Sequence, residues 1–376
     1  MSNPNVDLRT KGQSLWYDSL YRDLIVSGEL KRMIDEDGVL GIALDPVIFA
    51  RAISVQDSYR HGLPELAHGG KSAEGIVETL MVEDVSAACE LFFPVYDRTN
   101  FVDGLVSMPI SPHLAHDTDA IVKEAGRLFA GVGWQNLMIE VPATNAGIGA
   151  IEHLISEGIN VNATWLFWAE DCRKVAHAYI RGLKSRLDAG QFVDDVSSVA
   201  SFPVSRVDAK IDPELRDLIK RCESQEDKDL VAKLIGKAGV ANCRMAHAVV
   251  QEVFDDDEFK RLASKGARVQ RLLWCETGND NPQFRDTHYV QALIGADTVV
   301  SVSADTLQAF RKDGIVVRTL DAFPGAGAII ATELSNLEIN LYDLAPELLE
   351  KALSDQIESF DQVIERMAER IDALQE

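Results

Sequence analysis

The chain has 376 residues, 46% of them hydrophobic and 26% charged, and its formal net charge is −23 at pH 7. This composition predicts a globular protein with a large core, and the acidic balance argues against nucleic acid or an anionic membrane as a partner. No apolar stretch approaches the roughly 18 residues that a membrane helix needs. Five widely spaced cysteines and an N-terminus without a signal-peptide pattern predict a cytoplasmic protein that has no disulfide framework.

Short apolar runs alternate with stretches of helical periodicity along the chain. Eight runs predict strands, at 15–18, 39–44, 105–110, 137–141, 161–167, 198–204, 269–274 and 298–302. Amphipathic stretches between or after them predict helices, among them 73–91, 117–130, 169–187 and 305–311. This alternation is typical of parallel strands joined by crossover helices. We therefore predict one (β/α)8 TIM barrel over residues 1–376. A doubly wound sheet is the alternative, but no G-x-G-x-x-G pattern follows an early strand.

Two segments exceed what eight simple units require. Residues 212–265 predict a helical insertion between the sixth and seventh strands. Residues 343–376 carry apolar side chains at helical spacing and predict a C-terminal helix packed on the outside of the barrel.

Glu140 is an unusual residue within its segment. It interrupts the apolar run N-L-M-I-E-V-P-A-T at 136–144, which reads as a short buried strand ending at a proline. A carboxylate in such a run is costly unless it is paired, protonated or directed into a cavity.

Several motifs, in a fixed order, carry a family resemblance. They are G-Q-S-L-W-Y-D at 12–18, the run at 136–144, G-I-N-V-N-A-T at 158–164, S-V-A-S-F at 198–202 and Q-R-L-L-W at 270–274. Together they resemble the transaldolase family, especially its longer bacterial form. The resemblance implies a (β/α)8 barrel, a proton-transfer aspartate at Asp18, and substrate-placing side chains at Asn162, Thr164, Ser201 and Arg206.

The site departs from the family pattern at clustered positions. The family's I-K-V-P-A-T lysine, which forms the Schiff base, corresponds to Glu140, and a carboxylate cannot form that imine. A family asparagine corresponds to Asp45, and a glutamate to Pro109. After the seventh strand, a small hydroxyl and a cation correspond to Glu276 and Asp280. Acids beside the family's phosphate position would repel a phosphosugar.

The strand pattern also predicts a pocket of partly apolar character. Trp168 has the same strand parity as Asn162 and Thr164, so we expect it to face the barrel axis, with Met108 nearby. Asp45 could instead serve only to cap the helix that follows it.

The predicted function is that of a diverged enzyme. We expect Glu140, Asp18 and Asp45 to meet where the strands end and to catalyse isomerisation, dehydration, cyclisation or lyase chemistry on an unphosphorylated small molecule. The predicted substrate contacts are Asn162, Thr164, Ser201, Arg206, Trp168, Met108 and Glu276. We expect no cofactor, although oxygen ligands would suit a divalent metal, and the sequence leaves a homodimer open. The rival hypotheses are an inactive binding or scaffold homologue and a conventional transaldolase that uses a different lysine.

Overall fold

Eight parallel strands close into a barrel in the computed structural model, which describes residues 3–59, 62–279 and 281–375. Each strand pairs with the next, and β8 pairs with β1. The strands are β1 Gln13–Tyr17, β2 Val39–Ala43, β3 Leu105–Pro109, β4 Leu137–Pro142, β5 Asn160–Thr164, β6 Ser198–Pro203, β7 Arg271–Cys275 and β8 Thr298–Val302. The predicted barrel is confirmed, and all eight strands lie at or within about two residues of their predicted positions, apart from the end of β5.

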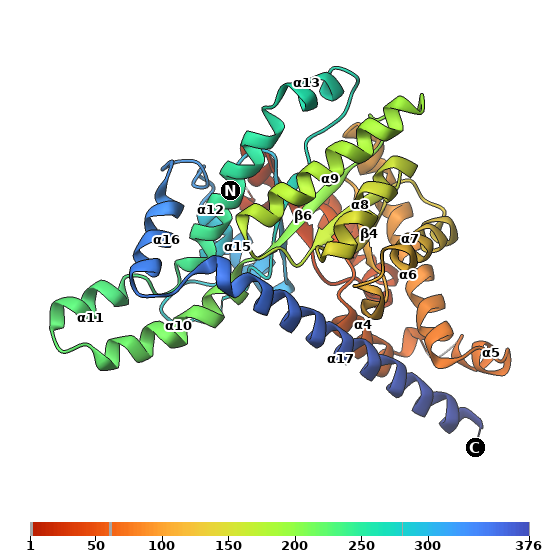
Figure 1. Ribbon diagram of the computed structural model, residues 1–376. Helices are drawn as coiled ribbons and strands as arrows, with labels where there is room; N and C mark the ends of the chain where they lie inside the picture. The colour runs from red at the N-terminus through yellow and green to blue at the C-terminus, as the bar shows by residue number, and fades with distance from the viewer. Residues whose placement is uncertain (1–2, 60–61, 280, 376) are drawn as a thin grey trace.

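Helices cover the outside of the barrel between successive strands (Figure 1). Those before β6 are α1 Pro4–Asp7, α2 Arg22–Val26, α3 Glu29–Glu36, α4 Pro46–Val55, α5 Leu63–His68, α6 Ala73–Arg98, α7 Thr118–Val132, α8 Asn145–Glu157 and α9 Ala169–Asp188. Those after β6 are α10 Val204–Arg221, α11 Gln225–Ala232, α12 Ala238–Phe254, α13 Asp257–Ala263, α14 His288–Ala292, α15 Ala304–Asp313, α16 Ala326–Asn336 and α17 Leu341–Gln375.

Side chains alternate along each strand between the barrel interior and the helix layer, as strand geometry requires. On β4, Leu137, Ile139 and Val141 belong to the large core shared with the helices, whereas Met138 packs inside the barrel. We call the end where the strands begin the lower end and the end where they finish the upper end. The interior below the pocket is filled by large apolar side chains, among them Trp16, Met138 and Leu273.

Gly41 on β2 makes room for this interior packing. A Cβ atom at this position would lie 2.4 Å from Cε2 of Trp16, which is fully buried. The indole therefore occupies space that any larger residue on β2 would need.

The strand predicted at 161–167 ends at Thr164, three residues early. Trp165 adopts a left-handed backbone with φ +64°, which an extended strand cannot accommodate. The chain then turns, and Trp168 becomes the N-cap residue of α9. Residues 165–168 therefore form a loop at the upper end.

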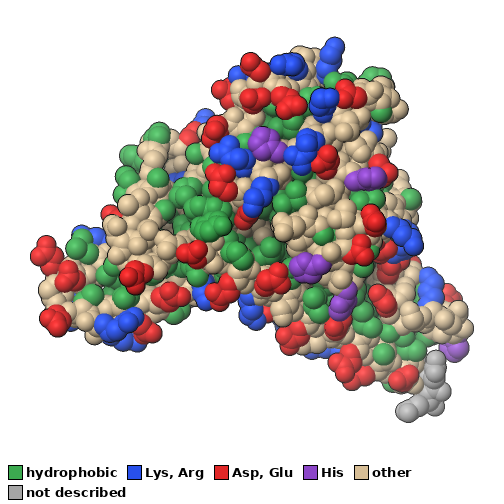
Figure 2. Space-filling model, viewed as in Figure 1, with side chains coloured by type: hydrophobic (Ala, Val, Ile, Leu, Met, Phe, Trp, Pro, Cys, Tyr) green, Lys and Arg blue, Asp and Glu red, His purple; other side chains and the backbone are tan. Residues whose placement is uncertain are grey.

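Four helices, α10 to α13, lie between β6 and β7, and the long helix α17 ends the described chain. Figure 1 shows α17 running diagonally across the molecule, and it contacts α4 and α6. In the described residues, none of the helices combines the length and apolar character needed to cross a membrane. On the face shown in Figure 2, acidic and basic side chains are interspersed.

Candidate active site

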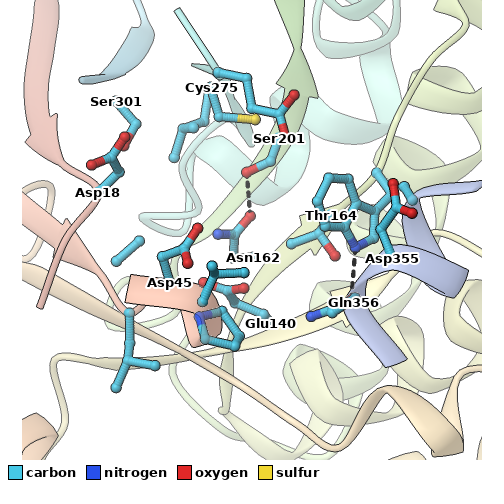
Figure 3. A pocket seen from close by; sticks show the side chains of 18 of the residues that line it. Asp18, Asp45, Glu140, Asn162, Thr164, Ser201, Cys275, Ser301, Asp355 and Gln356 are labelled. Atoms are coloured by element: carbon cyan, nitrogen blue, oxygen red, sulfur yellow. Dashed lines mark hydrogen bonds between the residues drawn. The ribbon is translucent and has the colours of Figure 1, made fainter. Parts of the chain in front are cut away.

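A pocket with a volume of about 250 Å³ opens at the upper end of the barrel. Its walls come from the ends of the strands, the start of α4, Trp165 and one side of α17. Eight residues that the sequence predicts for a site line this pocket: Asp18, Asp45, Glu140, Asn162, Thr164, Ser201, Arg206 and Glu276. Figure 3 shows many of these side chains arranged around the same hollow.

A series of hydrogen bonds crosses four neighbouring strands and ends at the carboxyl group of Glu140. Ser201 Oγ on β6 donates to Asn162 Oδ1 on β5 at 2.6 Å, and Asn162 Nδ2 donates to Ser107 Oγ on β3 at 3.0 Å. Ser107 Oγ in turn donates to Glu140 Oε1 at 2.7 Å. Every donor in this chain points toward the carboxyl group. The chain therefore orients Glu140 while leaving its second oxygen for the pocket.

Burial raises the pKa of Glu140 to about 7, with a smaller contribution from the nearby charge of Asp45, and the Ser107 hydrogen bond acts in the opposite direction. A carboxyl group with this pKa is present in both protonation states at neutral pH. Glu140 can therefore give or take a proton without a large free-energy cost.

Asp45 has two structural roles. As N-cap of α4 it accepts a hydrogen bond from the backbone N–H of Ile48 through Oδ1 at 2.9 Å, so the predicted cap is present. The same side chain lines the pocket. Burial raises the pKa of Asp45, whereas the α4 backbone donors and Arg206 oppose the rise. Capping and a position in the pocket are therefore not alternatives for this residue.

Asp18 follows β1 and faces the pocket from the opposite part of the barrel wall to β5. Ser19 Oγ donates to its Oδ1 at 2.7 Å. Burial raises the pKa of Asp18 to about 6, with further increases from the charges of Asp45 and Glu276. Asp18 is thus mainly a carboxylate at neutral pH, when Glu140 is partly protonated.

Arg206, from α10, is held by acids and by an aromatic ring. Its Nε lies 2.8 Å from both carboxylate oxygens of Glu276, and its Nη1 lies 3.6 Å from Asp355 Oδ2 on α17. The guanidinium stacks over the ring of Trp165, with Cζ 4.8 Å from the ring centroid. Glu276 adopts a left-handed backbone, φ +49°, in making this pair. The charge of Arg206 is therefore already matched by neighbouring carboxylates.

The structure corrects two predicted contacts, because neither Trp168 nor Met108 lines the pocket. Trp168 lies beyond the end of β5, where strand parity no longer applies, and its ring packs edge-on against Tyr342. Met108 has the opposite parity to Ser107 and is buried in the core shared with the helices. The apolar part of the pocket comes instead from side chains such as Leu44, Val47 and Leu273.

Several lining residues were not predicted from sequence: Trp165, Ser301, Asp355, Gln356 and Ser359, besides the hydroxyl of Ser107 behind Glu140. Gln356 accepts a hydrogen bond from Trp165 Nε1 at 3.0 Å, which connects α17 to the β5–α9 loop. The one sequence signal for Ser107 was its position on the predicted third strand, two residues before the departure at Pro109. The contribution of α17 has no local signal in the sequence.

None of the lining residues is a lysine, and all the lysines of the chain lie in the described ranges. Lys174 lines a second hollow on the other side of Trp165, where its Nζ pairs with Asp171 Oδ1 at 2.7 Å.

Asp280, predicted to oppose phosphate, lies outside the described residues. Within those residues, no group of three or more His, Cys, Asp or Glu side chains is placed to hold a metal ion.

The sequence matches the family model described as transaldolase/fructose-6-phosphate aldolase over residues 15–367. It is 35% identical to the transaldolase of Trichodesmium erythraeum, over all of this chain and 99% of that protein. It is 37% identical to the transaldolase of Mycolicibacterium smegmatis, over 99% of this chain and 98% of that protein, and 35% identical to transaldolase 2 of a Nostoc species, over 99% and 98%. These relatives support a transaldolase better than they support the diverged enzyme predicted above. The chain belongs to the transaldolase/fructose-6-phosphate aldolase family.

Proposed function

We propose that this member of the transaldolase family is an enzyme that uses carboxylate acid–base chemistry, and not a Schiff base, on a small unphosphorylated molecule. The observation that carries the proposal is that the pocket wall presents the carboxyl group of Glu140 and no amine. Glu140 is held there by Ser107, and no lysine lines the cavity. An imine requires an amine within reach of the substrate carbonyl, which these lining side chains do not supply.

Two carboxyl groups whose pKa values are raised by burial, Glu140 and Asp18, suit opposite roles. With its pKa near 7, Glu140 is the general acid, and with its pKa near 6, Asp18 is the general base. In an enolisation, Asp18 would accept the proton from the carbon next to a carbonyl, while Glu140 donates its proton to the carbonyl oxygen. The C–H bond breaks, an enol forms, and return of the protons restores both carboxyl groups.

Arg206 supports the unphosphorylated character of the proposed substrate. In phosphate recognition an arginine presents free N–H groups to the anion. Here Nε contacts Glu276, and Nη1 lies near Asp355. A phosphate that approached Arg206 would meet the negative charge of these two carboxylates beside it.

Proton exchange tests the acid–base half of the proposal. We expect the protein to catalyse hydrogen–deuterium exchange next to the carbonyl of unphosphorylated ketones such as dihydroxyacetone and fructose in D2O, followed by NMR. Glu140→Gln and Asp18→Asn should each slow this exchange by about 100-fold or more. Glu226→Gln, an exposed change on α11, is the matched control and should leave the rate unchanged. Exchange that survives both pocket substitutions would remove the assigned roles.

A conventional transaldolase is the second candidate, and the similarity to relatives named transaldolase favours it. Borohydride trapping with fructose 6-phosphate, read by mass spectrometry, separates it from the first. We expect no adduct on the native chain and a trapped adduct on E140K, which shows that the reagent and the sugar reach the pocket. An adduct on any lysine of the native chain establishes the second candidate, and its loss in K174A would identify Lys174 as the amine.

A further inference from the structure

The charges that line the pocket are strongly unbalanced. Five lining side chains are carboxylic acids and one is a cation, Arg206; the acids are Asp18, Asp45, Glu140, Glu276 and Asp355. Glu276 and Asp355 are the two that Arg206 contacts. The other three acids have no cation in hydrogen-bond contact among the described residues.

Neutral groups satisfy these three acids only in part. The donors to Asp18 are the Ser19 hydroxyl and a backbone N–H, the donors to Asp45 are backbone N–H groups at the start of α4, and the donor to Glu140 is the Ser107 hydroxyl. All of these donors are uncharged. A desolvated carboxylate in this position is stabilised by an added positive charge far more than by another neutral donor.

Ser301 provides an independent sign that a polar ligand belongs here. This residue of β8 is 2% exposed and lines the pocket, and its Oγ has no hydrogen-bond partner among the described residues. Figure 3 shows Ser301 beside Asp18 on one side of the hollow. Leaving a buried hydroxyl unpaired costs free energy, so a group that enters the pocket and bonds to it recovers that cost.

We propose that the ligand of this pocket is a small hydroxylated molecule that carries a protonated amine. The ammonium group supplies the positive charge that Asp18, Asp45 and Glu140 lack. The hydroxyl groups of the ligand find partners in Ser301 and in the polar wall formed by Asn162, Thr164 and Ser201. This inference rests on the proposed function, because it assumes that the same pocket holds the substrate.

The raised pKa values point in the same direction. Asp18, Asp45, Glu140 and Glu276 all hold protons more tightly than free carboxyl groups, chiefly because of burial. These carboxyl groups therefore bind a proton more tightly in the pocket than the same groups do in water. An ammonium ligand would stabilise the same carboxylates in their ionised form, with three N–H donors in place of one proton.

Three molecules of matched shape test the proposal by calorimetry: glucamine, its neutral counterpart sorbitol, and sorbitol 6-phosphate. At about pH 8 the amine remains protonated while Asp18 and Glu140 are largely ionised. We expect the native protein to bind glucamine at least about tenfold more tightly than sorbitol, and sorbitol 6-phosphate most weakly. Glu140→Gln and Asp45→Asn should remove this preference without weakening sorbitol.

The control is Glu226→Gln, which removes one negative charge from an exposed position on α11 and so reports general attraction by the acidic surface. The preference for glucamine should survive it. Equal affinities for glucamine and sorbitol, tighter binding of the phosphate, or a glucamine Kd above about 10 mM would each overturn the proposal. If Glu140→Gln loses exchange activity but the native protein shows no preference for glucamine over sorbitol, this inference alone is overturned and the acid–base function stands.

Discussion

At the lower end of the barrel, Arg271 and Asp103 are each only 11% exposed and form an ion pair of 3.0 Å. The same guanidinium also donates to Ser14 Oγ at 2.7 Å and to the carbonyl of Val102 at 2.6 Å. At the upper end, a single arginine faces five acids across an open pocket. One end of the barrel therefore matches its charges, while the other keeps an excess of one sign.

The contrast separates what the fold requires from what the site requires. The paired charge at the lower end shows that this barrel accommodates ions when each has its partners. Asp18, Asp45 and Glu140 at the upper end lack that compensation and lie where barrel enzymes place their chemistry. Their cost is therefore better attributed to a ligand than to the stability of the barrel.

The largest effect is expected from Arg271→Met at the lower end. Removing this guanidinium leaves Asp103 buried beside an apolar side chain, which should lower the free energy of unfolding by about 3–5 kcal/mol. Arg206→Met is the upper-end counterpart, and it should cost about 1 kcal/mol or less because Arg206 and Glu276 are each about 30% exposed. Urea unfolding measures both. Similar losses would show that the two ends do not differ in this way.

Gly41→Ala should be the next most damaging change. The new methyl group would meet the Trp16 ring, and relief of that clash should cost about 1–3 kcal/mol in the free energy of unfolding. Gly278, beyond β7 at the upper end, has open space at its Cβ position, so Gly278→Ala should stay within about 0.5 kcal/mol of the native value. A stable Gly41→Ala protein would mean that the interior is less tightly packed than described.

Glu140 should make stability fall with rising pH. Its pKa rises on folding from its ordinary value of 4.5 to about 7, so the folded state keeps a proton that the unfolded state releases. The favourable contribution is complete below about pH 4.5 and is lost as the pH rises toward 7. Relative to Glu140→Gln, the native protein should lose about 3 kcal/mol across this window, as measured by unfolding at each pH. Parallel curves for the two proteins would contradict the assigned pKa.

Ser107→Ala should produce the smallest effect. The change removes the hydrogen bond that favours the ionised form of Glu140 and should raise the pKa of Glu140 by up to about one unit. Infrared titration of the carboxyl band reports this shift. Ser198→Ala is the control, since the Ser198 hydroxyl bonds to the carbonyl of Val161 and not to an acid. An unchanged titration in Ser107→Ala would mean that the chain of donors does not act on Glu140.

Much of this arrangement could be predicted from the sequence because strand geometry is periodic. Asp18, Glu140, Asn162 and Ser201 lie on or directly after strands, where alternation decides which face each side chain takes. That rule failed for Trp168 because the left-handed backbone at Trp165 ended β5 first. Met108 was expected near the pocket without use of this rule, and alternation instead gives the inward position to its neighbour Ser107.

The rest of the site depends on tertiary contacts that local pattern does not encode. Asp355 and Gln356 come from α17, and Gln356 meets a tryptophan 191 residues away in the chain. Helical periodicity predicts that such a helix has an apolar face but does not say where on the barrel that face packs. The unpaired hydroxyl of Ser301 likewise becomes visible only when all its neighbours are known.

The double role of Asp45 bears on how such a pocket can arise. The N-cap position of a helix accepts asparagine and aspartate almost equally well. The family pattern has asparagine where this chain has Asp45, so exchange between the two keeps α4 capped through a side-chain oxygen. The substitution therefore changes the charge of the pocket by one unit while the barrel pays little in stability. A helix-cap position that faces a cavity can therefore change the charge that the cavity offers to a ligand with little change in the stability of the fold.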